Sequence, residues 1–314
     1  MWLHVRMFIL LGVMFAIVYA IIVVIASFMG IGSFLLYGVI AILLTFVQYW
    51  ISPRIVEWSM RVHYVSPEEE PELHRMVEEL ANKAGIKKPR VAISDIRIPN
   101  AFAFGRSIGD GRVCVTKGLL DLLDKNELKA VLGHEISHIR HRDMIFMTML
   151  GVIPMILWYL SWSSMYARGS NRDNLALVGL FAFIFYFITN LLVLYASRIR
   201  EYYADRGSIE LGNRPHTLAS ALYKLVYGSA SVSDYDLKQV EGYKAFFVND
   251  PSRAHKELKE LKDLDVNMSG TIENDELEIL KKGKIKLGFT DRLMEILSTH
   301  PNMLKRIKYL SSLS

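Results

Sequence analysis

The stretch Val131–Asp143 reads VLGHEISHIRHRD and stands directly before residues 144–167, which contain no Asp, Glu, Lys or Arg. His134 and His138 are four positions apart, so on a helix they share one face and both imidazoles reach a single zinc ion. Between them, Glu135 is placed to take a proton from a water that the metal acidifies. The stretch therefore predicts metal-assisted peptide hydrolysis beside a membrane. The alternative is an ordinary amphipathic helix that matches HExxH by chance.

A zinc site of this kind needs a third protein ligand. His141 is the nearest candidate, but a metzincin needs a glycine and a histidine six residues after the second one, and here the helix is expected to run on. Other zinc peptidases use a carboxylate from a later helix, and Glu201 in SRIREYYADRGS qualifies. Asp205, one turn further on, is a candidate outer acceptor for an imidazole. The alternative for Glu201 is a solvated charge paired with Arg198.

Hydrophobic residues make up 52% of the chain, which is high for a soluble protein of 314 residues. Residues 7–53 carry no charge, and glycines near position 30 divide them into two spans, 7–29 and 33–51. Residues 144–167 and 174–197 are also free of charge and have the length of a bilayer crossing. Four transmembrane helices in two hairpins are therefore expected.

Arginines flank these spans on one side, which predicts a multi-pass protein of the cell membrane with both termini and the catalytic part in the cytoplasm. The single cysteine, Cys114, agrees with a reducing compartment. The net charge of +5 is explained by these flanks, so no nucleic-acid partner is expected. The predicted organisation is a hairpin at 1–53, a catalytic part at 54–143, a hairpin at 144–197 and a second catalytic part at 198–314.

The first catalytic part shows local patterns for a helix and a small sheet. Ser66 and Pro67 predict the start of a helix that Gly85 ends, and residues 126–138 read as a second helix with Glu127 in its first turn. Short β-like runs follow the first helix at Val91–Ser94, Ala101–Phe104 and Arg112–Thr116. NAFAF, from Asn100 to Phe104, is either an edge strand that pairs with an extended peptide or an ordinary hairpin strand with its phenylalanines in the core.

Four blocks carry a family resemblance. NAFA at Asn100–Ala103, GHEISH at Gly133–His138, REYYAD at Arg200–Asp205 and THPNMLKRI at Thr299–Ile307 resemble the HtpX-type membrane zinc metalloproteases, relatives of the CAAX prenyl proteases. The resemblance covers nearly the whole chain. It implies an α+β, mostly helical protein with four transmembrane helices and a cytoplasmic gluzincin-like domain. It also implies zinc on His134, His138 and Glu201, Glu135 as general base and acid, and a role in membrane-protein quality control.

His300 opens the last of these blocks. With Pro301 after it, the residue either starts a helix or donates a hydrogen bond to an oxyanion opposite the zinc. Asn100 and Tyr202 are further candidates for that donor role.

One segment departs from the family pattern. Residues 265–276, DVNMSGTIENDE, match a twelve-residue EF-hand loop with a turn glycine at its sixth position. Calcium is a candidate second metal there, on the oxygen-bearing side chains of Asp265, Asn267, Ser269, Thr271 and Glu276. The alternative is a polar turn between two charged helices.

Two classes of function remain after these patterns. The first is a zinc metalloendopeptidase that cleaves membrane or misfolded polypeptides on the cytoplasmic side. The second is a membrane-anchored metal-binding scaffold without proteolytic activity, and a CAAX-type prenyl-protein protease is a further alternative. A structural zinc is closed by four protein ligands and does not need Glu135, so the intact HExxH favours the enzyme.

Overall fold

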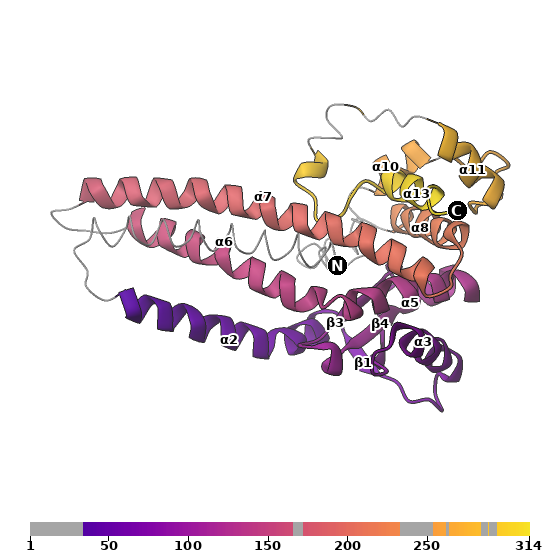
Figure 1. Ribbon diagram of the computed structural model, residues 1–314, viewed down its shortest axis with the longest axis horizontal. Coiled ribbons are helices and arrows are strands. Elements are labelled where there is room, and N and C mark those ends of the chain that lie inside the picture. Colours follow the sequence, from indigo (N-terminus) through magenta and orange to yellow (C-terminus); the bar gives the residue numbers. More distant parts are fainter. Residues whose placement is uncertain (1–33, 166–171, 233–253, 262–263, 284–287, 289–293) are drawn as a thin grey trace. The chain divides into compact units, whose positions relative to one another are not determined.

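The computed structural model describes most of the chain, namely residues 34–165, 172–232, 254–261, 264–283, 288 and 294–314. Within these residues the protein is mostly helical with one small mixed sheet (Figure 1). The predicted first membrane span, residues 7–29, lies outside the described residues. The helical part of the expected fold class is therefore confirmed for the described part of the chain.

The chain divides into two compact units. The first takes the chain up to Ile51 together with Ile145–Ser197, and the second takes Ser52–Met144 together with Arg198–Ser314. Three helices run from one unit into the other: α2 (Phe34–Ser59), α6 (Asp143–Met165) and α7 (Arg172–Glu210). Two segments, Asp143–Trp162 in α6 and Ala176–Glu210 in α7, are long and apolar enough to cross a membrane. They contain the predicted third and fourth spans almost completely.

The sheet lies in the second unit and has the strand order β1-β2-β4-β3. β2 (Arg90–Ser94) and β4 (Arg112–Thr116) are parallel in the centre, while β1 (Val62–Tyr64) and β3 (Ala101–Phe104) flank them in antiparallel pairing. Three strands lie where the sequence predicts them. β1 was not predicted, because three residues are too few to show an alternating pattern.

The two faces of the sheet pack into different apolar clusters. Ile93 and Val115 point toward the helices of the main core, whereas Cys114 and Phe102 point to the other face, where Met60 covers them. This alternation follows from the pleat of the strands. β3 is an edge strand of the described sheet and both of its phenylalanines are buried, as the hairpin interpretation of NAFAF predicts, while pairing with an extended peptide stays a prediction.

α3 (Pro71–Ala84) begins later than expected. The prediction of a start at Ser66 is wrong, because the Ser66 carbonyl accepts from the N–H groups of Glu69 and Glu70 in a separate turn. Pro71 then occupies the first helical position, where its missing N–H costs nothing. The end at Gly85 is confirmed, and its φ of 67° is the left-handed conformation that glycine adopts easily.

α5 (Lys125–Arg140) carries the HExxH residues and confirms the predicted helix. The expectation that it runs on into the next span is wrong, because the helix ends at Arg140 and α6 begins at Asp143. Between them Arg142 has a φ of 61°, a left-handed conformation that turns the chain. The turn changes the direction in which the side chain of Asp143 points.

Four helices gather on one side of the second unit in Figure 1: α8 (Pro215–Ala230), α10 (Ala254–Leu261), α11 (Asn274–Lys282) and α13 (Met303–Ser311). Their buried leucines and isoleucines belong to the main core cluster, among them Leu222, Leu261, Leu277 and Ile307. α10 precedes the EF-hand-like loop, and α11 begins within its last residues, so a charged helix lies on each side of it.

Candidate metal centre

The start of α5 is fixed by a capping box. The Asp124 carboxylate accepts from the N–H groups of Asn126 and Glu127 at 2.8 and 2.9 Å, and the Glu127 side chain accepts from the Asp124 N–H at 3.0 Å. The Glu127 carboxylate also binds Ser220 and Lys224 of α8 at 2.7 and 2.8 Å. These contacts fix the start of α5 and its rotation about its own axis. The HExxH residues therefore face the interior.

α5 and the last part of α7 cross at two glycines. A Cβ on Gly207 would lie 2.3 Å from Ser137 Oγ, and one on Gly133 would lie 2.9 Å from Ser208 Oγ. At the same crossing, Ser208 Oγ donates to the carbonyl of Ala130 at 2.6 Å. Because each glycine leaves room for a serine side chain of the other helix, the helices lie close enough for Glu201 to face the histidines of α5.

Substituting Gly207 by Ala is therefore expected to destabilise the protein by about 1–3 kcal/mol, since the new methyl overpacks the crossing. Thermal unfolding in detergent measures the loss. Ser137→Gly removes the atoms that the methyl meets, so the double variant should lose less than the sum of the two single variants. A Gly207→Ala protein as stable as wild type would mean that the helices are farther apart than described.

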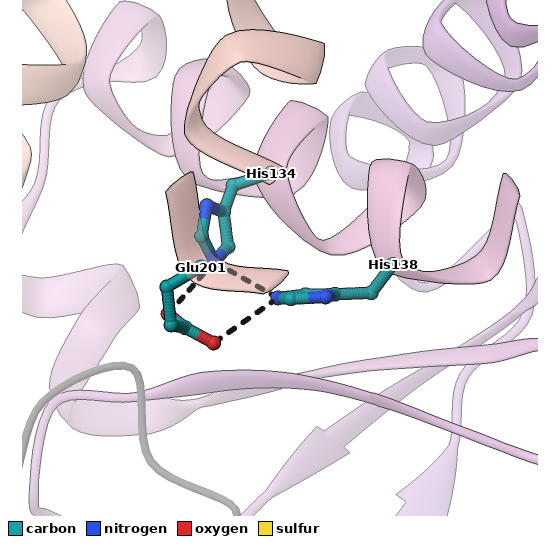
Figure 2. Close-up of side chains that lie close together, drawn as sticks. All are labelled: His134, His138 and Glu201. Carbon is teal, nitrogen blue, oxygen red and sulfur yellow. Dashed lines mark hydrogen bonds and ion pairs between the residues drawn. The ribbon is translucent and has the colours of Figure 1, made fainter. Parts of the chain in front are cut away.

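The three predicted zinc ligands converge in the second unit. Ligand atoms of His134, His138 and Glu201 all lie within 4.8 Å of one another (Figure 2). The two Nε2 atoms are 3.1 Å apart, Glu201 Oε2 lies 3.5 Å from the first of them, and Oε1 lies 3.5 Å from the second. Ligand atoms around a tetrahedral zinc are spaced by about 3.3 Å, so this donor set fits the ion in number, type and spacing.

A carboxylate stands behind each imidazole. Asp205 Oδ1 lies 2.9 Å from His134 Nδ1, and Asp143 Oδ2 lies 2.6 Å from His138 Nδ1. An Nδ1–H donated to a carboxylate leaves the lone pair on Nε2, which is the form that binds metal. Asp205 therefore lies next to His134, and its role as an outer acceptor stays a prediction.

The sequence analysis missed Asp143. On a continuous helix a residue five positions after His138 points about 140° away from it. The turn at Arg142 removes that restriction, and Arg200 of α7 pairs with the same oxygen of Asp143, its Nε 3.1 Å from Oδ2.

Asp143→Asn is expected to weaken zinc binding roughly 10–100-fold, because the amide supports the donor tautomer of His138 less well than a carboxylate does. Competition with a chelator of known affinity measures the change. Asp121→Asn in α4 (Lys117–Leu122) is the matched control, since Asp121 is exposed. Equal zinc affinity in the Asp143 variant and this control would contradict the role given to Asp143.

Glu135 is buried between the two histidines, with 3% of its surface exposed. Its carboxylate lies within hydrogen-bonding reach of the backbone N–H of Ala103 in β3. Burial raises the pKa of Glu135 above its ordinary value, although the neighbouring imidazoles oppose this shift. A carboxylate in such surroundings is suited to accept a proton and return it.

His300 is buried beside the three ligands, with its Nδ1 3.6 Å from Glu201 Oε2. Neither ring nitrogen makes a hydrogen bond to any residue that the structure describes. Tyr202 lies elsewhere, because its ring packs edge-on against Tyr309 of α13 at 5.3 Å. His300 is therefore a predicted donor with a ring nitrogen 3.6 Å from a ligand carboxylate, and its role as a donor stays a prediction.

The EF-hand-like loop is closed by its own first and last carboxylates. Asp265 accepts from the N–H groups of Ser269 and Gly270, each at 2.8 Å, and Glu276 accepts from the N–H of Val266 at 2.8 Å. Gly270 has a φ of 77°, which agrees with a sharp turn at the sixth position. Calcium binding by this loop stays a prediction.

Comparison with known proteins gives a consistent result. Residues 67–314 match the model of peptidase family M48. A protease HtpX homolog of Methanothermobacter thermautotrophicus is 56% identical over 224 residues, which cover 71% of this chain and 86% of that protein. A protease HtpX homolog of Moorella thermoacetica is 36% identical over 275 residues, 85% of this chain and 80% of the relative.

Among solved structures, the crystal structure of S. mikatae Ste24p superposes with a TM-score of 0.50 at 16% sequence identity. The similarity covers 94% of this chain and 62% of that one. At this identity the likeness concerns the fold alone.

Proposed function

The chain belongs to peptidase family M48, and from that premise we propose that it is a membrane-embedded zinc endopeptidase that cleaves membrane or misfolded proteins on the cytoplasmic side. The observation that carries the proposal is the meeting of His134, His138 and Glu201 beside the buried Glu135. Three protein ligands leave a fourth position for water or substrate, as catalytic zinc sites require.

Each residue of the site has a defined task in peptide hydrolysis. A bound zinc ion supplies Lewis acidity to the scissile carbonyl and to the attacking water. Glu135 takes the proton of that water and returns it to the leaving amine. His300 donates a hydrogen bond to the oxygen that becomes negative in the transition state. The carboxylates of Asp205 and Asp143 keep the imidazoles of His134 and His138 in their ligand tautomer.

The substrate backbone is proposed to pair with β3. The N–H of Thr116 donates to the carbonyl of Asn100, so alternation along the strand turns the backbone groups of Ala101 and Ala103 away from β4. The N–H of Ala103 lies near Glu135, which places this edge next to the proposed base. An extended chain added there would bring its peptide bond to the site, a binding mode that favours unfolded polypeptides.

The proposed topology has four spans, with both termini and the catalytic residues in the cytoplasm. It is supported by the two apolar segments in α6 and α7 and by Arg140, Arg142, Arg198 and Arg200 beside them. Cys114 is the only cysteine and is buried, so single cysteines placed at positions 31 and 312 can be labelled selectively in intact cells. Position 312 should be protected from an impermeant reagent, and its labelling would contradict the topology.

The function is tested with the purified full-length protein in detergent. A membrane protein is offered once folded and once destabilised, with zinc supplied and with zinc removed by a chelator. We expect zinc-dependent cleavage of the destabilised form only. Zinc-dependent cleavage of a prenylated C-terminal peptide alone would favour the CAAX-type alternative, and zinc binding without cleavage of any of these substrates would favour a scaffold.

Calcium binding by the loop is proposed as a separate, accessory property. It is supported by the buried carboxylates of Asp265 and Glu276, which stand at the first and twelfth positions of the pattern. Calorimetric titration of the zinc-loaded protein should show one calcium site that Asp265→Asn abolishes. Asp275→Asn, outside the five predicted ligands, is the control. A wild-type protein without this heat of binding would contradict the proposal.

A further inference from the structure

α13 carries a positive charge into the interior of the second unit. Arg306 is 0% exposed, and its helix is seated by the buried side chains of Met303, Ile307 and Leu310 against α8 and α11. The ammonium group of Lys308 also donates to the last carbonyl groups of α11, at 2.6 and 3.1 Å. These contacts fix the place from which the guanidinium of Arg306 reaches the metal centre.

The guanidinium contacts two carboxylates of α7 at once. Its Nη2 and Nε lie 2.6 and 3.0 Å from the two oxygens of Asp205, which is a bidentate pair. The remaining nitrogen, Nη1, lies 3.1 Å from Glu201 Oε2. One side chain therefore binds both the third metal ligand and the carboxylate that orients His134.

These contacts set the direction of both acids. With Oε2 of Glu201 held by Arg306, the carboxylate turns Oε1 toward His138 at 3.5 Å. With both oxygens of Asp205 held, Oδ1 stays 2.9 Å from His134 Nδ1. A glutamate has three rotatable side-chain bonds, so without such a partner it would sample orientations that do not face the imidazoles.

We propose that Arg306 is a positioning residue that sets the metal affinity of the site, so that zinc is held tightly only when α13 is seated. The proposal rests on the metal site of the proposed function. It adds an energetic coupling between α13, which carries Arg306, and α5, which carries the HExxH residues. By linkage, zinc in turn stabilises the seated position of α13.

A simpler role for Arg306 would be charge compensation, because two buried carboxylates need a cation nearby. Lysine separates the two roles. It keeps the charge, but its side chain is one atom shorter and its single ammonium lacks the planar fork that binds Asp205 and Glu201 together. If only charge matters, Arg306→Lys retains the site, whereas a positioning role predicts its loss.

The experiment uses the full-length protein in detergent, stripped of metal and titrated with zinc against a chromophoric chelator. Arg306→Lys should bind zinc roughly 10–100-fold more weakly than wild type. Its cobalt form should also show a shifted visible absorption spectrum, a readout of ligand geometry. Arg206→Lys in α7 is the matched control, because among the described residues Arg206 makes a surface ion pair with Glu210, and it should keep affinity and spectrum.

A second measurement does not depend on any variant. Zinc should slow hydrogen exchange of the α13 amides in the wild-type protein relative to the metal-free form. Wild-type affinity and spectrum in Arg306→Lys, an equal loss in Arg206→Lys, or exchange in α13 unaffected by zinc would each overturn the inference. His138→Ala with undiminished zinc affinity would instead overturn the metal site itself, and with it both proposals.

Discussion

Glu135→Gln should lower the rate of peptide cleavage by about 10²–10⁴-fold, because the amide cannot accept the proton of the attacking water. The substitution keeps the size of the side chain and touches none of the three ligands. Zinc content and unfolding temperature should therefore stay near wild-type values. Initial rates on a destabilised membrane protein, measured at matched zinc occupancy, test this expectation.

The same variant separates catalysis from metal binding. If Glu135→Gln retained more than about a tenth of the wild-type rate with zinc in place, Glu135 would not be the base, since proton transfer by a positioned group contributes at least about 10²-fold. If the variant lost its zinc, the lost activity would report on the metal and not on the proton. The result that supports the mechanism is an inactive protein with a full complement of zinc.

Glu201→Gln should remove both zinc binding and activity. The neutral amide is a poorer metal ligand, and it also leaves Nη1 of Arg306 buried without its carboxylate partner. The expected loss in zinc affinity exceeds the roughly 10–100-fold assigned to an outer carboxylate. Metal analysis after dialysis, together with the cleavage rate, measures it.

Glu210→Gln is the control for this substitution on the same helix. Among the described residues, Glu210 pairs with the exposed side chains of Arg206 and Arg140, and such surface pairs contribute about 0–1 kcal/mol. The control should bind zinc and cleave substrate as wild type does. Tight zinc binding in Glu201→Gln would show that the third ligand lies elsewhere.

Local patterns predicted much of the second unit. Alternation located β2, β3 and β4 within a residue or so, because their side chains divide between two apolar clusters. The three zinc ligands could also be predicted. HExxH gives two of them on one helix, and few acidic residues follow the predicted fourth span, from which the third ligand comes. In both cases the structure depends on a pattern that is visible in the local sequence, either an alternation or a motif.

The residues that were missed depend on contacts distant in sequence. Asp143 reaches His138 only because Arg142 adopts a left-handed conformation, and nothing in HRHRD announces that turn. Arg306 stands in a recognisable block, but its partner Asp205 lies 101 residues earlier, so no spacing rule connects them. Gly133 and Gly207 at the helix crossing were missed for the same reason, because the serine that each of them contacts lies on the other helix.

The separation of Asp205 and Arg306 in sequence also means that the two residues are synthesised at different times. At about 5–20 residues per second, the ribosome needs roughly 5–20 s to travel the 101 residues that separate them. During that interval both histidines and Glu201 already exist, while the side chain that aligns them has not been made. On the proposed role of Arg306, the site holds zinc tightly only after this side chain has been added, when the predicted spans have already been translated.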